Sequence, residues 1–210
     1  MRVLGTRSWQ IRLDRWSQAH DVALWFRAAE RIDAPAGGEV PGPLDISPVP
    51  TRSATVDADL AAGWHAWWHA IVTMPAPTLP GPGAEFVPPD VGFYPPDFER
   101  LAPWPALHEV VAHRWHEAYE WHNARKGAAL VAGRHIPRHS RENEVVSRVE
   151  RELRRRVAPF LLDLIALPVL DDEVRPTTDG RFLVPERVYD GDGWPDVLRA
   201  LVLRADAAIS

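Results

Sequence analysis

The stretch from Pro105 to Asn123, PALHEVVAHRWHEAYEWHN, constrains the fold of this chain more than any other. At the 100° step of an α-helix, its apolar side chains fill one broad arc, which is typical of a helix packed on a core. The opposite arc is narrow and polar, because acids and imidazoles recur there every three or four residues. The residues on this polar arc are Glu109, His113, His116, Glu117 and Glu120.

Two more helices are expected before this one. Ser17 is a suitable N-cap for the first, whose apolar residues recur at helical spacing as far as Ile32. Asp57 or Asp59 can cap the second, which reaches about Thr73 and carries three tryptophans in its apolar stripe. The 10 tryptophans of the chain supply large buried areas at few positions. A substantial core is therefore expected.

Prolines interrupt the segment between the second helix and the central one. Nine of the chain's 21 prolines lie between Met74 and Trp104, where each removes a backbone donor and disfavours helix in the residue before it. The segment also carries large apolar side chains, which a solvated linker would lack. Residues 74–104 are therefore predicted to form a loop that wraps the helices.

The C-terminal part of the chain mixes helix and turn signals. Residues 140–157 predict a helix capped by Ser140, and Pro159 is expected to kink it or to begin a new helix through Leu167. Residues 178–181, Thr-Asp-Gly-Arg, are a turn sequence between residues 173–175 and 182–184, which predicts a hairpin. Pro195 is expected to open the last helix.

These elements together predict a mainly α fold. It is an irregular helical bundle of about five helices, with long proline-rich loops and a small C-terminal β-hairpin. The 210 residues suit a single domain over 1–210, with a helical body at about 14–167 and the hairpin and last helix at 171–206. Residues 8–13 alternate apolar and polar side chains and predict a half-buried strand, with a helical start as the alternative.

Composition excludes several classes of function. The chain has no cysteine, which removes disulfides, thiolate metal sites and cysteine nucleophiles. Its start lacks the apolar core of a signal peptide, and its longest apolar stretch is short for a membrane span, so we expect a soluble cytoplasmic protein. The net charge of -5 argues weakly against a dedicated nucleic-acid binder.

One constellation could hold a metal ion. Glu109 and His113 lie one helical turn apart, and His69 or His65 from the preceding helix could complete a set of three ligands. Two neutral imidazoles and a carboxylate around a divalent ion such as Zn²⁺ leave a position for water, whose pKa the ion lowers toward neutrality. We take His69, Glu109 and His113 as the candidate ligands.

The order of these three residues, a helical His followed later by Glu-x-x-x-His, is similar to the zinc triad of DinB-like and maleylpyruvate-isomerase-like helical bundles. This resemblance covers three residues and implies a hydrolase or isomerase type of centre. The proline-rich segment, the strand-like start and the hairpin depart from a plain four-helix bundle. In such a centre, Glu117 or Glu120 would act as the base.

The same residues also fit a structural role. Glu109 with His113, His113 with Glu117 and His116 with Glu120 are i,i+4 pairs that stabilise a solvated helix face by roughly 0.2–0.5 kcal/mol each. His108 and His122 lie toward the apolar side of the helix, where we expect them to bond to backbone or loop carbonyls.

A basic helix face is the candidate partner surface. Residues 134–156 carry eight arginines against four glutamates, and four of the arginines share one face. These four are Arg141, Arg148, Arg151 and Arg155. Such a face can track phosphates, but Glu144 and Glu152 interrupt it and no aromatic residue is interleaved for base stacking.

Three functions remain open. The first is a non-catalytic accessory or interaction protein that binds a protein partner or a second copy. The alternative is a metal-dependent helical enzyme acting on a small molecule. The second alternative is nucleic-acid binding through the arginine-rich helix.

Overall fold

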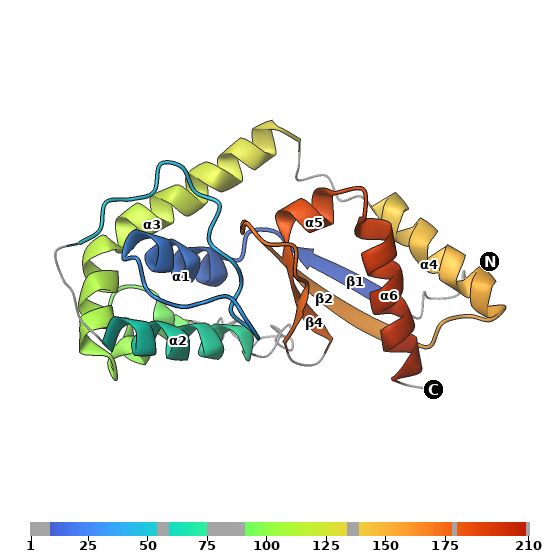
Figure 1. Cartoon of the computed structure of the whole chain (residues 1–210), viewed down its shortest axis with the longest axis horizontal. Helices are drawn as coiled ribbons and strands as arrows, with labels where there is room; N and C mark the ends of the chain where they lie inside the picture. The colour runs from blue at the N-terminus through green and yellow to red at the C-terminus, as the bar shows by residue number, and fades with distance from the viewer. Residues whose placement is uncertain (1–8, 54–58, 75–90, 134–138, 178–179, 209–210) are drawn as a thin grey trace, which may run out of the picture. The chain divides into compact units, whose positions relative to one another are not determined.

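The computed structural model describes residues 9–53, 59–74, 91–133, 139–177 and 180–208 (Figure 1). Contacts within the chain gather into two compact units. The helical unit comprises Trp16–Ala128 and Pro168–Asp171, and the sheet unit comprises Met1–Arg15, Ala129–Leu167 and Asp172–Ser210. Whether the two units form the single domain expected from the sequence stays a prediction.

The helical unit contains the predicted helices. They are α1 (Gln18–Ala29), α2 (Asp59–Val72) and α3 (Pro105–Val131), with two short 3₁₀ turns, η1 (Val91–Phe93) and η2 (Glu99–Leu101), before α3. The central helix is therefore confirmed, although it continues past the Lys126-Gly127 pair where we expected it to fade. Ser17 occupies the N-cap position of α1, but its hydroxyl lies 2.7 Å from His20 Nδ1 instead of bonding to a helix amide.

Tryptophans of α2 form the centre of this unit. Trp64, Trp67 and Trp68 are all buried, and the rings of Trp64 and Trp68 stack with centroids 5.5 Å apart. Trp64 Nε1 donates a hydrogen bond of 2.7 Å to the carbonyl of Ala23 in α1, which satisfies the buried indole. Gly63 lies against the start of α3, because a Cβ atom there would come within 2.9 Å of Trp104 Cβ.

The described residues of the sheet unit form a four-stranded mixed sheet. Its strands are β1 (Trp9–Asp14), β2 (Phe160–Leu167), β3 (Arg175–Pro176) and β4 (Arg181–Pro185), in the order β1-β2-β4-β3. The strands β1, β2 and β4 are parallel, and β3 runs antiparallel to β4. The helices described in this unit are α4 (His139–Leu153), α5 (Glu186–Asp190) and α6 (Trp194–Ala207).

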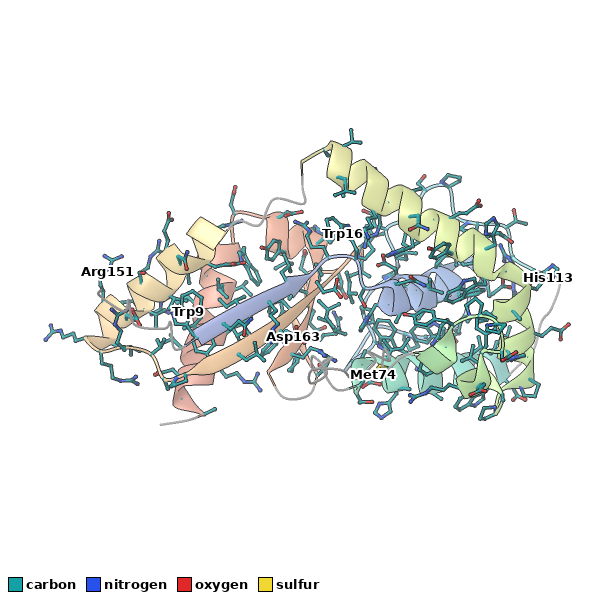
Figure 2. All side chains as sticks on the ribbon, turned by 180° about the vertical axis from the view of Figure 1, so that it is seen from behind. Trp9, Trp16, Met74, His113, Arg151 and Asp163 are labelled. Atoms are coloured by element: carbon teal, nitrogen blue, oxygen red, sulfur yellow. The ribbon has the colours of Figure 1, made fainter. Side chains whose placement is uncertain are left out.

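One face of this sheet carries the core of the unit, and Figure 1 shows α6 crossing that face. Alternate residues of β2, Phe160, Leu162 and Leu164, join apolar residues of α4 and α6 in one buried cluster. The opposite face is more polar, because Asp163 of β2 accepts a hydrogen bond of 2.9 Å from Arg181 Nε of β4. Figure 2 views this second face, with Asp163 labelled.

The fold class is therefore α/β, and the prediction of a mainly α bundle with a small hairpin is wrong in this respect. Residues 160–167, expected to be helical, form the parallel strand β2. Strand β1 and the last helix are confirmed, and the predicted hairpin is the β3–β4 pair, which is part of the larger sheet. The cap Asp57, most of the wrapping loop and the turn at 178–179 lie outside the described residues.

None of the helices in the described part of the chain combines the length and the hydropathy that a membrane span needs.

Candidate functional site

A polar pocket of about 540 Å³ lies along α3 in the helical unit. One wall is the segment Thr51–Ser53, and the other is a face of α3 on which the lining residues recur at helical spacing. The α3 residues in the wall are Glu109, Val110, His113, Arg114 and Glu117. Three residues of the predicted polar arc therefore meet in one pocket.

A buried ion pair lies beside this pocket. Arg114 is 6% exposed and donates a hydrogen bond through Nη1 to Oε1 of Glu30, which is 1% exposed. The other carboxylate oxygen of Glu30 accepts two hydrogen bonds from Ser53, at 3.1 Å from the backbone N–H and 2.6 Å from the hydroxyl. Because both oxygens of Glu30 have donors, its charge is compensated although it is buried.

Glu117 is held by the same arginine. Arg114 donates hydrogen bonds from Nε to Oε1 of Glu117 at 3.0 Å and from Nη2 to Oε2 at 2.7 Å, which makes a bidentate ion pair. The hydrogen bond with Arg114 lowers the pKa of Glu117, and the reciprocal bond raises the pKa of Arg114. A carboxylate that holds its charge in this way is a weak proton acceptor near neutral pH, so this geometry does not favour the base role predicted for Glu117.

The position of Arg114 explains why it is buried. It lies on α3 one turn after Val110 and one turn before Ala118, both of which are buried in the apolar arc. Its guanidinium also lies over the ring of Trp25, with Cζ 4.9 Å from the centroid. Neither Arg114 nor Glu30 was predicted from the sequence, although a cation inside an apolar stripe is a signal that a buried acid must be nearby.

The three candidate metal ligands do not come together. His69 Nδ1 lies 3.0 Å from Glu39 Oε1, and the His69 side chain is 65% exposed. Glu109 and His113 line the pocket, and Figure 2 shows His113 projecting outward from α3. Within the described ranges, no group of three or more His, Asp or Glu residues could hold a metal ion. The metal centre stays a prediction that this arrangement does not support.

Glu120, the second candidate base, lies apart from the lining residues. Its Oε1 is 3.1 Å from His116 Nε2, and both side chains are exposed. This is the i,i+4 pair that the structural alternative predicts on a solvated helix face.

A second buried network joins α1 to α3. Asp21 is fully buried, and its Oδ2 lies 2.7 Å from Nδ1 of the buried His122. Arg125 Nη2 donates to both oxygens of Asp21 at 2.9 Å. The prediction that His122 bonds to a carbonyl is therefore wrong, whereas His108 bonds to the carbonyl of Asp97 as expected.

The two networks fix α1 against α3 at two levels. Asp21 near the start of α1 meets His122, and Glu30 just after the end of α1 meets Arg114, which comes eight residues before His122 in the chain. The two helices therefore run antiparallel, with one charged contact at each end of α1. Only one relative position of the helices satisfies both contacts, because a shift by one turn would leave buried charges without partners.

The four candidate arginines, three on α4 and Arg155 just beyond its end, fall into two groups. Arg141 donates to the carbonyls of Tyr189 and Gly191, at 3.5 and 2.5 Å, and Arg155 donates to both oxygens of Asp206, at 2.9 and 2.5 Å. The hydrogen bond with Asp206 raises the pKa of Arg155. Arg148 and Arg151 are exposed, and Figure 2 shows Arg151 pointing away from the sheet unit. The structure therefore leaves two of the four for a partner.

Comparison with family models, with curated proteins and with solved structures finds no match for this chain.

Proposed function

We propose that this chain is a non-catalytic accessory protein that binds an acidic protein partner. The observation that carries the proposal is the pairing of Glu117 with Arg114. This ion pair engages Glu117, one of the candidate bases in the pocket, in a structural contact. The second candidate base, Glu120, lies in an exposed pair with His116. Among the described residues, the ionisable groups near the pocket therefore support the helix packing better than they support a reaction.

The partner surface is the exposed side of α4. Val145, Val146 and Val149 face the core of the sheet unit, so the opposite side of the helix presents Arg148 and Arg151 to solvent. Two exposed guanidiniums one turn apart suit a pair of carboxylates on a protein, whereas a nucleic-acid backbone needs a longer track of cations, which Glu144 and Glu152 interrupt.

Charge reversal tests this role. The full chain, immobilised on a resin and incubated with a lysate of its source cells, should capture a partner. The variant that combines Arg148→Glu with Arg151→Glu should not capture it. Arg204→Glu is the matched control, because Arg204 is an exposed arginine on α6 of the same unit. Capture of the same proteins by the double variant and by the control would contradict the proposal. Salt-sensitive retention of the wild-type chain on a polyanion column, lost in the double variant, would favour nucleic acid instead.

A metal-dependent enzyme is the second candidate. Two of its candidate ligands, Glu109 and His113, line the pocket one helical turn apart, and this is the observation behind the candidate. Elemental analysis of untagged protein should then find about one bound Zn or similar ion per chain, lost in His113→Ala and retained in His116→Ala, whose histidine is exposed on α3 and is not a candidate ligand. Equal, background levels of metal in all three proteins would reject this candidate.

A further inference from the structure

The two outer strands of the sheet differ in what they offer to another strand. Strand β3 has two residues, one of which is Pro176, and proline has no N–H to donate. Strand β1 has six residues without proline, and its one strand neighbour in the described part of the chain is β2. A long and regular edge strand is a template for pairing, whereas β3 has the features that block it.

The side chains of β1 alternate between two environments. Trp9, Ile11 and Leu13 are half buried and pack against the apolar cluster under α4 and α6, whereas Gln10 and Arg12 are exposed on the other face. The apolar row therefore reaches the edge of the sheet with part of its surface in solvent. A strand added beside β1 would cover this row and continue the core.

We propose that β1 pairs antiparallel with β1 of a second copy of the chain, around a twofold axis at Ile11. An axis perpendicular to the sheet keeps the helix-covered faces of both copies on the same side and makes the two strands antiparallel. Ile11 then lies opposite Ile11 of the second copy, and Trp9 lies opposite Leu13 of the second copy. On the exposed face, Gln10 lies opposite Arg12 of the second copy.

Charge and length select this register. An axis at Arg12 would place two guanidiniums directly opposite each other, and like charges in that position are destabilising. An axis at Leu13 would leave three residues of each β1 opposite β1 of the other copy. The register at Ile11 aligns five residues of each strand, avoids a like-charge contact and joins the two apolar rows. Because such an interface is small, we expect a weak dimer with a dissociation constant that is roughly micromolar.

The dimer formed through β1 uses a surface separate from the arginines of α4, which are proposed to bind a different partner. Loss of dimers in a β1 variant therefore tests the strand pairing, whereas Arg148→Glu with Arg151→Glu should leave the dimer unchanged. The two proposals can fail independently.

The experiment is a charge exchange at Gln10, whose side chain is exposed and can be replaced without disturbing the core. Sedimentation of the full chain from about 1 to about 300 µM should show a monomer–dimer equilibrium. In Gln10→Lys, the new lysine lies opposite Arg12 of the second copy, and the twofold axis makes this contact twice. The dissociation constant should therefore rise by about two- to thirty-fold, whereas Gln10→Glu should lower it by a similar factor. Combining Gln10→Lys with Arg12→Glu places opposite charges across the axis again and should restore the dimer.

Ser147→Lys provides the control, because it adds the same charge at an exposed position on α4 and should leave the dissociation constant unchanged. A wild-type chain that stays monomeric throughout this range overturns the proposal. A dimer that responds equally to Gln10→Lys and Gln10→Glu, or that the double exchange does not restore, also overturns it. Circular dichroism of each variant separates loss of pairing from loss of folding.

Discussion

The helical unit and the sheet unit place their charges differently. In the helical unit, Asp21 and Glu30 are almost completely buried and each bonds to an arginine of α3. In the sheet unit, the centre is an apolar cluster, and buried charges pair with more exposed partners, as Asp206, whose side chain is 5% exposed, does with Arg155, at 48%. Other pairs, such as Arg187 with Asp172, lie on the surface, with side chains 55% and 69% exposed. A pair with both members buried costs more desolvation than a pair with one exposed member, so charged contacts constrain the helices of the helical unit more tightly than they constrain the elements of the sheet unit.

The difference shows what positions the elements in each unit. Helices packed through apolar ridges alone can shift by a turn and still bury their stripes. The contacts of Asp21 and Glu30 remove that freedom between α1 and α3. Strands need no such device, because the backbone ladder and the alternation of side chains set the register of β1, β2 and β4.

The largest expected effect is on the buried charges. Asp21→Asn should destabilise the helical unit by about 3–5 kcal/mol, because the charge of Arg125 then lies in a partly buried position without its acid. Urea denaturation, with amide exchange to locate the loss in α1, measures it. Asp33→Asn changes an exposed acid shortly after α1 and should have little effect. A cost under about 1 kcal/mol for Asp21→Asn would mean that the network does not fix the helices.

The next effect concerns the apolar cluster. Leu164→Ala should destabilise the sheet unit by about 3 kcal/mol, because Leu164 is fully buried on the helix-covered face. Leu161→Ala, on the same strand, should cost much less because Leu161 is 40% exposed. A helix would bring these two leucines to nearly the same side, whereas a strand separates them. Similar costs for the two variants would therefore contradict the strand.

A smaller effect should appear in the stability of the sheet unit at acid pH. The hydrogen bond from Arg155, and then that from the Ala158 N–H, lower the pKa of Asp206 below its usual 3.8. The stabilisation by this carboxylate is therefore present above pH 3.8 and is lost as the pH falls through the lower folded-state pKa. Asp206→Asn should remove that part of the acid dependence in thermal melts from pH 5 to about 2. Asp196→Asn, which changes an exposed acid on the same helix, should leave the acid dependence as it is in the wild type. Equal slopes of melting temperature against pH for the two variants would contradict the assignment.

The smallest effect belongs to a surface pair. Asp172 Oδ1 lies 3.0 Å from Arg187 Nε, and both side chains are largely exposed. Asp172→Asn should cost no more than about 1 kcal/mol in a urea titration, and the cost should fall as salt is added. A cost near that of Asp21→Asn would remove the contrast between the two units.

Helical periodicity predicted α1, α2, α3 and α6, because each of these helices has one face on a core and one in water. It failed at Phe160–Leu167, because β2 lies in the middle of the sheet and most of its side chains are buried on both faces. Alternation is then lost, and a short apolar run after a proline resembles a helix as closely as a strand. The sheet could not be inferred without β2, because β2 joins β1 to β4.

The candidate site was predictable only within one helix. The spacing of Glu109, His113 and Glu117 places them on one face of α3, and all three line the pocket. Contacts between helices were not predictable, because they depend on how α2 and α1 lie against α3. His69 for this reason pairs with Glu39 instead of joining the set, and Arg114 finds Glu30.

The parallel ladder between Trp9 and Phe160 has a consequence for how the chain is made. Synthesis proceeds from the N-terminus, so β1 leaves the ribosome before the whole of α1, α2 and α3 and must wait for its neighbour. The helical unit, except for Pro168–Asp171, is complete while the sheet has only one strand. Released fragments that end before residue 160 should therefore protect α1–α3 from proteases and leave the first strand open to cleavage or to chaperones.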